Sequence, residues 1–173
     1  MADLLAYGED ASVPWLDQET RWSCGPASLR AVLAGYDVHA DEPTLSKLAN
    51  CKPGHGTDEY DLVRAARKLG FQAWSNLWRS PESLRVCTRR GVPVICCVIS
   101  WNIPGAFHWI VVMSVEDGEV LIMDPHPPRG ETNERVLDRD EFAKRWWHVE
   151  GWWLFKRRVS HLGVVVAPRG VEF

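Results

Sequence analysis

Cys24 and Gly25 stand where a helix is predicted to begin, because Pro26 suits the first helical positions and an apolar run follows as far as Gly35. Ser23 would cap the first turn. The free N–H groups and partial positive charge of a helix N-terminus favour a thiolate and can bind the oxyanion of an attacked carbonyl group. Gly25 would leave space for substrate beside the sulfur. The pair therefore indicates a nucleophile, although a lone free cysteine is more often a buried apolar residue.

A histidine and an aspartate are expected to meet on neighbouring strands. His108 begins one predicted strand, Asp124 ends the next, and Asp117-Gly118 between them is a strong hairpin signal. Positions 108 and 124 are centred on residue 116, beside that turn. An imidazole there can act as the base for a thiol, and a carboxylate can hold it in the useful tautomer. The simpler alternatives are a surface histidine and an aspartate that merely ends a strand.

Gln18 lies six residues before Cys24, where a side-chain amide can donate to the same oxyanion. In a polar loop such a residue is usually just solvated, so its meaning depends on the others. The chain order Gln, Cys, His, Asp is much more specific than any one of its members. We predict Gly25, Trp22 and Trp109 as substrate-binding residues, since tryptophan often lines grooves.

The elements that must position these residues fall into two groups along the chain. Helical spacing of apolar residues and possible caps at Asp41 or Thr44 and at Thr57 or Asp58 predict helices first, and antiparallel strands follow. This is an α+β layout with helices packed on one side of a sheet. The predicted helices cover about 24–35, 42–49, 58–69, 80–89 and 138–146; the predicted strands cover 71–77, 93–100, 108–115, 120–123 and 152–155.

Composition limits the functional classes. The chain has 173 residues, which fits one domain over 1–173, and a net charge of −3 that gives no basic field for nucleic acid. No segment reads as a membrane span or a secretory signal.

Five cysteines, an odd number, indicate a reducing cytoplasm, with Cys96-Cys97 packed in the core. The ten tryptophans leave core packing and a groove or partner surface both open. We expect no cofactor and no metal site, since Cys51, His55 and His126 lack zinc-ligand spacing.

The sequence as a whole resembles that of a known family. It is similar to the bacteriocin-processing, double-glycine leader peptidases, which are papain-like cysteine peptidases. The resemblance covers about residues 15–155 and leaves about 156–173 as a C-terminal extension, in which apolar Val164 to Ala167 have no assigned role. The segments that carry it are Gln18, Cys24 to Leu29, Gly56-Thr57, Ala65 to Phe71, Pro93 to Ile95, His108 to Val112 and Ile122 to Pro125.

The resemblance implies a papain-like fold and a role for each matched residue. Cys24 is the implied nucleophile, His108 the general base and acid, Asp124 the orienting carboxylate and Gln18 the oxyanion donor. The implied substrate is a leader or precursor peptide, cut after a small residue such as glycine. Family members are commonly the N-terminal domain of an ABC exporter. This sequence has neither a transmembrane region nor a GxxxxGK[ST] motif, so we expect a stand-alone domain without transport coupling.

Two other functions use the same residues differently. A transpeptidase or ligase would form the same thioester and pass the acyl group to an amine. A binding module would hold a leader peptide without cutting it, but the presence of all four candidate catalytic residues argues against that. The sequence leaves the identity of the substrate and the oligomeric state open.

Overall fold

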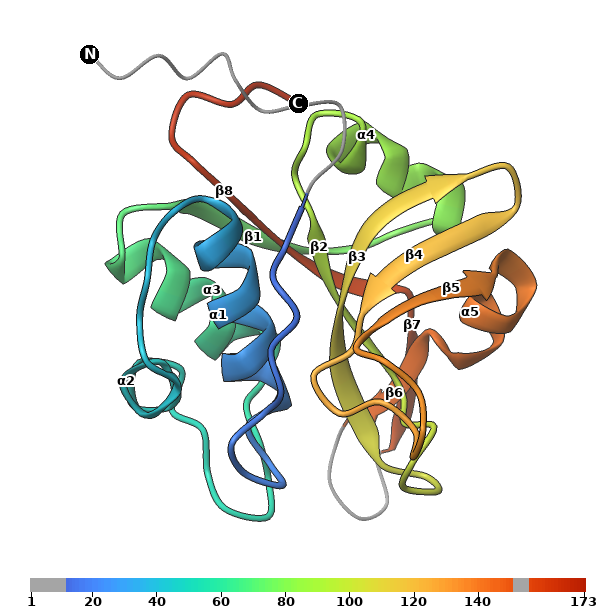
Figure 1. Cartoon of the computed structure of the whole chain (residues 1–173), viewed down its shortest axis with the longest axis horizontal. Helices are drawn as coiled ribbons and strands as arrows, with labels where there is room; N and C mark the ends of the chain where they lie inside the picture. Colours follow the sequence, from blue (N-terminus) through green and yellow to red (C-terminus); the bar gives the residue numbers. More distant parts are fainter. Residues whose placement is uncertain (1–11, 151–155) are drawn as a thin grey trace.

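The computed structural model describes residues 12–150 and 156–173, in which helices flank an antiparallel sheet (Figure 1). The six-stranded sheet has the order β1-β8-β2-β3-β4-β5, and β6 and β7 form a separate pair. The helices are α1 (Cys24–Gly35), α2 (Glu42–Leu48), α3 (Glu59–Lys68), the 3-10 turn η1 (Pro81–Leu84), α4 (Arg85–Thr88) and α5 (Arg139–Arg145). The strands are β1 (Gln72–Leu77), β2 (Val94–Ile99), β3 (Phe107–Glu116), β4 (Glu119–Met123), β5 (Glu134–Asp138), β6 (Trp147–Glu150), β7 (Arg157–Ser160) and β8 (Leu162–Ala167).

The predicted α+β class is confirmed, with one correction to how the layers are arranged. Helices α1 and α3 pack on one face of the sheet, as expected, and α2 packs against these two helices (Figure 1). The other face is also covered, by η1, α4 and α5. Strands β2 and β8 are therefore buried on both faces, which explains why they are apolar almost throughout instead of alternating.

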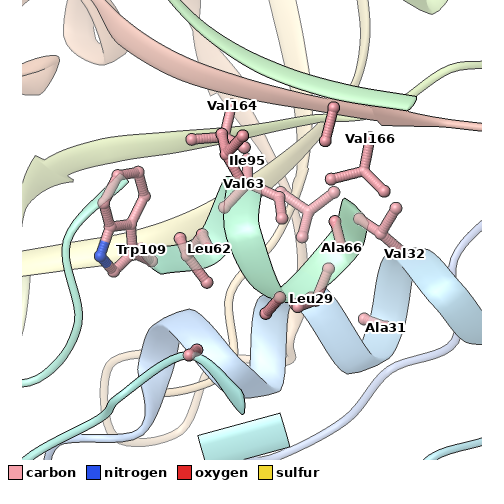
Figure 2. Close-up of a cluster of buried hydrophobic side chains, with 14 of the residues drawn as sticks. Leu29, Ala31, Val32, Leu62, Val63, Ala66, Ile95, Trp109, Val164 and Val166 are labelled. Carbon is pink, nitrogen blue, oxygen red and sulfur yellow. The ribbon is translucent and has the colours of Figure 1, made fainter. Parts of the chain in front are cut away.

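The larger core lies between the N-terminal helices and the sheet. Figure 2 shows Leu29 of α1 and Leu62 and Ala66 of α3 packed below Val164 and Val166 of β8. All five side chains are fully buried. This packing fixes α1 against the sheet, so the position of its first residue relative to β3 is set by a close-packed interior.

Helix starts follow the predicted caps in two cases and depart in a third. Asp41 caps α2 by accepting from the Thr44 N–H at 2.8 Å, and Asp58 caps α3 by accepting from the Asp61 N–H at 2.8 Å. Ser23 occupies the N-cap position of α1, but its side chain makes no capping bond. The expectation that Ser23 caps the first turn is therefore wrong, and its hydroxyl bonds to Thr20 instead.

The C-terminal residues contribute to the sheet. Strand β8 lies between β1 and β2 and pairs antiparallel with both. Residues 164–167, which had no assigned role in the sequence, are thus in the middle of the core. The predicted strand over 152–155, with the pair Trp152-Trp153, lies outside the described residues.

Two tryptophans next to each other have opposite environments. Trp146 is fully buried and donates its indole N–H to the Leu162 carbonyl at 2.8 Å, so it is a core residue. The Trp147 ring lies under the Arg158 guanidinium, 4.3 Å from the ring centroid.

Cys96 and Cys97 are both buried free thiols, as expected from the sequence. Within 12–150 and 156–173, no helix is long and apolar enough to cross a membrane.

Candidate active site

Cys24 is the first residue of α1 and is 9% exposed. The His108 side chain and the backbone of Trp109 and Gly25 act on its sulfur and favour its ionised form. The first turn of α1 adds the partial positive charge of its unpaired N–H groups. A sulfur in this position is surrounded by groups that stabilise a thiolate.

The turn before α1 is organised by Ser23. Its hydroxyl donates to the Thr20 carbonyl at 3.1 Å and accepts from the Thr20 N–H at 3.0 Å. Because Ser23 is turned back in this way, it leaves the N–H groups at the start of the helix free of a side-chain cap. Those N–H groups stay available to a substrate oxygen.

His108 and Asp124 meet across the β3–β4 hairpin, as predicted. The His108 Nε2 lies 2.7 Å from Asp124 Oδ1, and both side chains are almost fully buried. The turn residues Asp117 and Gly118 have φ of 49° and 86°, the positive values that a type I′ hairpin turn requires.

The register of the hairpin differs from the simple centring on residue 116. Glu116 pairs with Glu119, and an irregularity between Val112 and Ser114 shifts the pairing before Val111 meets Met123. Asp124 therefore lies one step beyond Met123, opposite position 110, and reaches His108 diagonally along the same face of the sheet. Diagonal neighbours of this kind are within reach of an imidazole.

The pKa values of Cys24, His108 and Asp124 all shift in the direction that favours the charged form. Burial raises the pKa of the Cys24 thiol, but the hydrogen bond and charge of His108 outweigh it and the net pKa is lowered. Burial lowers the pKa of His108, while hydrogen bonds to Asp124 and Cys24 raise it, with a net value of about 10. Burial also opposes ionisation of Asp124, yet His108 and Arg135 hold its pKa below the ordinary value. The shifts of all three groups therefore favour their charged forms, which are thiolate, imidazolium and carboxylate.

Asp124 has partners that the sequence did not indicate. Its Oδ1 also accepts the His126 N–H at 2.8 Å, and its Oδ2 lies 3.3 Å from Arg135 Nη1. Arg135 comes from β5, where it pairs with Ile122 two residues before Asp124. No local pattern marks an arginine as the neighbour of an aspartate on another strand. The signal existed only as alternation along β5, which places Arg135 on the same face of the sheet as Asp124.

Gln18 lies beside the other three candidates. It borders the same cavity as Cys24 and His108. Its Nε2 donates to the Thr20 carbonyl at 2.7 Å, and its Oε1 is buried without a partner among the described residues. An amide nitrogen carries two donors, so one N–H remains for a substrate oxygen. The role of Gln18 as oxyanion donor stays a prediction.

Gly25 has a structural reason that differs from the expected one. A side-chain carbon on Gly25 would lie 2.3 Å from Thr57 Cγ2 and 3.2 Å from Trp109 Cδ1. The absent side chain therefore faces packed protein, and the expectation of open space for substrate there is wrong. Glycine is required because the start of α1 packs directly against Thr57 and Trp109. Contact of Gly25 with substrate through its backbone stays a prediction.

Trp22 and Trp109, the two tryptophans predicted to bind substrate, line two different cavities beside Cys24. Trp109 is 6% exposed and donates its indole N–H to the Thr57 carbonyl at 3.0 Å. Trp22 is half-buried, and its carbonyl accepts from the Cys51 thiol at 3.3 Å. Their binding of substrate also stays a prediction.

Two cavities meet at Cys24. One, of about 510 Å³, contains His108 together with Gln18, Trp22 and Arg21. The other, of about 240 Å³, extends past Trp109 to Glu59 and His148. Cys24 therefore lines both cavities.

Within the described residues, no group of three or more His, Cys, Asp and Glu side chains could hold a metal ion. The thiol of Cys51 is instead occupied with the Trp22 carbonyl, and burial raises its pKa to about 11.

Comparisons with known proteins agree on the fold and the family. Residues 12–150 match the model of the Peptidase C39 family. An uncharacterized protein of Methanothermobacter marburgensis is 32% identical over 108 residues, which cover 62% of this chain and 68% of that protein. The peptidase domain of Streptococcus ComA, a bifunctional ABC transporter involved in a quorum sensing pathway, has a similar structure with a TM-score of 0.68 and 20% identity. That match covers 91% of this chain and 100% of the domain.

A second solved structure is a double glycine motif protease from an AMS/PCAT transporter, in complex with its leader peptide. It matches with a TM-score of 0.66 and 21% identity, over 92% of this chain and 94% of that one. At these identities the structural likeness concerns the fold.

Proposed function

The chain belongs to the peptidase C39 family and is a cysteine peptidase, and we propose that Cys24, His108 and Asp124 hydrolyse a bond in a leader or precursor peptide. The proposed bond follows a small residue such as glycine. The observation that carries the proposal is the position of the His108 ring, which bonds Asp124 Oδ1 through Nε2 at 2.7 Å and lines one cavity with Cys24, whose pKa it lowers. Since Nε2 is taken by Asp124, Nδ1 is the ring nitrogen left for the sulfur.

The proposed reaction is acyl transfer to water. The Cys24 thiolate attacks the peptide carbonyl and forms a tetrahedral intermediate, whose oxygen is bound by the Cys24 N–H and the Gln18 amide. The His108 imidazolium gives its proton to the leaving amine as the carbon–nitrogen bond breaks. Neutral His108 then takes a proton from water, whose oxygen attacks the thioester; the carbon–sulfur bond breaks, the acid leaves, and the Cys24 thiolate and the His108 imidazolium are restored. Asp124 keeps the ring oriented and stabilises its charged form throughout.

The proposed substrate class follows from the family and from the shape of the site. The double glycine motif protease with a similar fold was solved with a leader peptide bound. In this chain, cavities on two sides of Cys24 provide room for a peptide to extend in both directions. The cytoplasmic location expected from the odd number of cysteines also stays a prediction.

The test combines a thiol probe with peptide cleavage. At pH 6, iodoacetamide should label Cys24 first, as read by peptide mapping, because the pKa of Cys24 is lowered and those of the other four cysteines are not. Peptides containing a Gly-Gly junction should gain the mass of one water on cleavage, and Cys24→Ala should abolish this. Cys51→Ser serves as the matched control, since Cys51 is a nearby thiol whose pKa is raised.

The other possible results of these two assays distinguish the alternative functions. Unchanged cleavage by Cys24→Ala protein would refute the proposed nucleophile. Selective labelling together with an aminolysis product, when an amine is added, would assign acyl transfer instead of hydrolysis. Binding of the peptides without labelling or cleavage would identify a binding module.

A further inference from the structure

The smaller cavity beside Cys24 contains ionisable groups that the proposed mechanism does not use. It has a volume of about 240 Å³ and lies between the start of α3, the start of β3 and strand β6. We call it the Glu59 cavity. Its lining includes Cys24, Glu59, Cys97, Trp109, His148 and Glu150.

Glu59 is a buried carboxylate without a counter-ion. It is 8% exposed, and within the described residues no Lys, Arg or His side chain lies within ion-pair distance of it. The segments outside the description, residues 1–11 and 151–155, contain no basic side chain. Burial raises the pKa of Glu59, and the Glu59 backbone N–H and nearby His148 offset this only in part. A buried charge of this kind is normally paired.

His148 adds a second unsatisfied group. It is 7% exposed, and its Nε2 bonds Glu150 Oε1 at 3.1 Å. Its Nδ1 is buried and has no hydrogen-bond partner among the described residues. Because Nε2 faces a carboxylate, Nε2 is the nitrogen that carries the proton in the neutral ring, and Nδ1 is then an acceptor.

Two side-chain donors of the lining, from Trp109 and Thr57, are already used. The Trp109 indole N–H bonds the Thr57 carbonyl, and the Thr57 hydroxyl bonds the Ala49 carbonyl. What the cavity offers a ligand is therefore the Glu59 carboxylate and, in the neutral ring, the Nδ1 acceptor of His148. Glu150 also lines the cavity, but its two oxygens are paired with His148 and Arg157. Lysine and arginine side chains are the natural complement, since they carry only donors and a positive charge.

We propose that the Glu59 cavity binds the lysine or arginine side chain of a substrate residue close to the scissile bond, with Glu59 as its main charge partner. This inference rests on the proposed peptidase function and adds to it. Because the residue at the scissile bond is proposed to be small, the basic side chain belongs to a neighbouring residue. A glycine at that neighbouring position would leave the cavity empty.

The larger cavity has the opposite character, which gives the substrate a direction. It is lined by Arg21 and by His108, which carries a positive charge in the active form. A basic side chain would be repelled there and attracted to the Glu59 cavity. The basic residue is therefore expected on one side of the cleavage site only.

Binding to Cys24→Ala protein tests the inference without depending on turnover. Fluorescent peptides with a Gly-Gly centre carry lysine, norleucine or glutamate, one at a time, at each of the three positions on either side. Fluorescence anisotropy gives the dissociation constants. We expect lysine at one position to bind about tenfold to a hundredfold more tightly than norleucine there, the usual effect of a hydrogen bond to a charged group. Glutamate should bind more weakly than norleucine.

Variants then assign the preference to the cavity. Glu59→Gln, made in the Cys24→Ala protein, should remove most of the difference between lysine and norleucine, while Glu119→Gln at an exposed hairpin position should leave it unchanged. Because burial opposes the charge of Glu59 and no ion pair holds it, the neutral amide of the same shape removes no native salt bridge. Should Glu59→Gln fail to fold by circular dichroism, Glu150→Gln provides the second measurement and should reduce the same difference.

The results separate this inference from the proposed function. Equal affinity for lysine and norleucine at every position would overturn the inference, as would a lysine preference that survives both Glu59→Gln and Glu150→Gln. Failure of the protein with Cys24 intact to cut any peptide would count against the proposed peptidase mechanism, while a lysine preference in binding would still support the cavity assignment.

Discussion

The charge of Asp124 is the feature whose removal tests the catalytic arrangement most directly. Asp124→Asn keeps the shape of the side chain and an oxygen that can accept the His126 N–H. It removes the negative charge that lies 2.7 Å from His108 Nε2 and 3.3 Å from Arg135 Nη1. The imidazolium of His108 then loses its main stabilising partner.

The size of the effect follows from that one contact. A hydrogen bond to a charged group contributes about 1.5–3 kcal/mol, and one pKa unit corresponds to about 1.36 kcal/mol. The pKa of His108, about 10 in the native protein, should therefore fall by about 1 to 2 in the Asp124→Asn variant. The direction is downward because a nearby negative charge favours the protonated ring, and the variant lacks it.

The rate of Cys24 alkylation by iodoacetamide measures this pKa without any substrate. The rate rises once as the thiolate forms at low pH, and changes again at high pH as the imidazolium loses its proton. Because Cys24 and His108 titrate as a coupled pair, each of the two steps in the rate reports on the pair and not on one residue alone. We expect the high-pH step to move down in Asp124→Asn and to stay in place in Asp37→Asn, a change at a fully exposed aspartate with positive φ, where asparagine is well tolerated. A high-pH step at the same position in both variants would refute the charged-pair description.

Three further changes test other parts of the structure. Gln18→Ala should lower the rate of peptide cleavage by about a hundredfold, as loss of one oxyanion donor does, and should leave alkylation of the nucleophile unchanged; a similar loss in alkylation would mean that the residue acts on the thiol. Gly25→Ala should reduce the free energy of unfolding in urea by about 1–3 kcal/mol, because the added methyl group collides with Thr57, and native stability would argue against the tight packing there. Trp146→Ala should cost about 3–5 kcal/mol by the same measurement, whereas Trp15→Ala, at a 59% exposed position, should cost little; equal losses would contradict the assigned burial.

Local patterns in the sequence predicted the elements that carry the site. The start of α1 at Cys24, the caps at Asp41 and Asp58 and the turn at Asp117-Gly118 all appear as expected. Each depends on residues within about four positions of one another, where a single side chain or a positive φ decides the outcome. The approach of His108 to Asp124 was predictable for the same reason, because a short hairpin links them.

Ser23 shows where local reasoning stopped working. A serine before a helix normally caps it, but here its hydroxyl turns back to Thr20. The sequence offered both partners, and the choice depends on the path by which residues 12–20 approach the site. On that path the backbone N–H of Gln18 donates to the Pro125 carbonyl, which is a contact between segments far apart in the sequence.

The sequence by itself thus determined where the helices and the strands β1 to β4 begin, and it predicted Cys24, His108 and Asp124 as partners. Only the tertiary structure placed β8 between β1 and β2, brought Arg135 behind Asp124, and closed Glu59 and His148 around a cavity beside Cys24. Turns and caps are decided by neighbours in the chain, and so they can be read in order. Contacts between distant strands are decided by which apolar faces bury each other best, and that choice is made by the whole core at once.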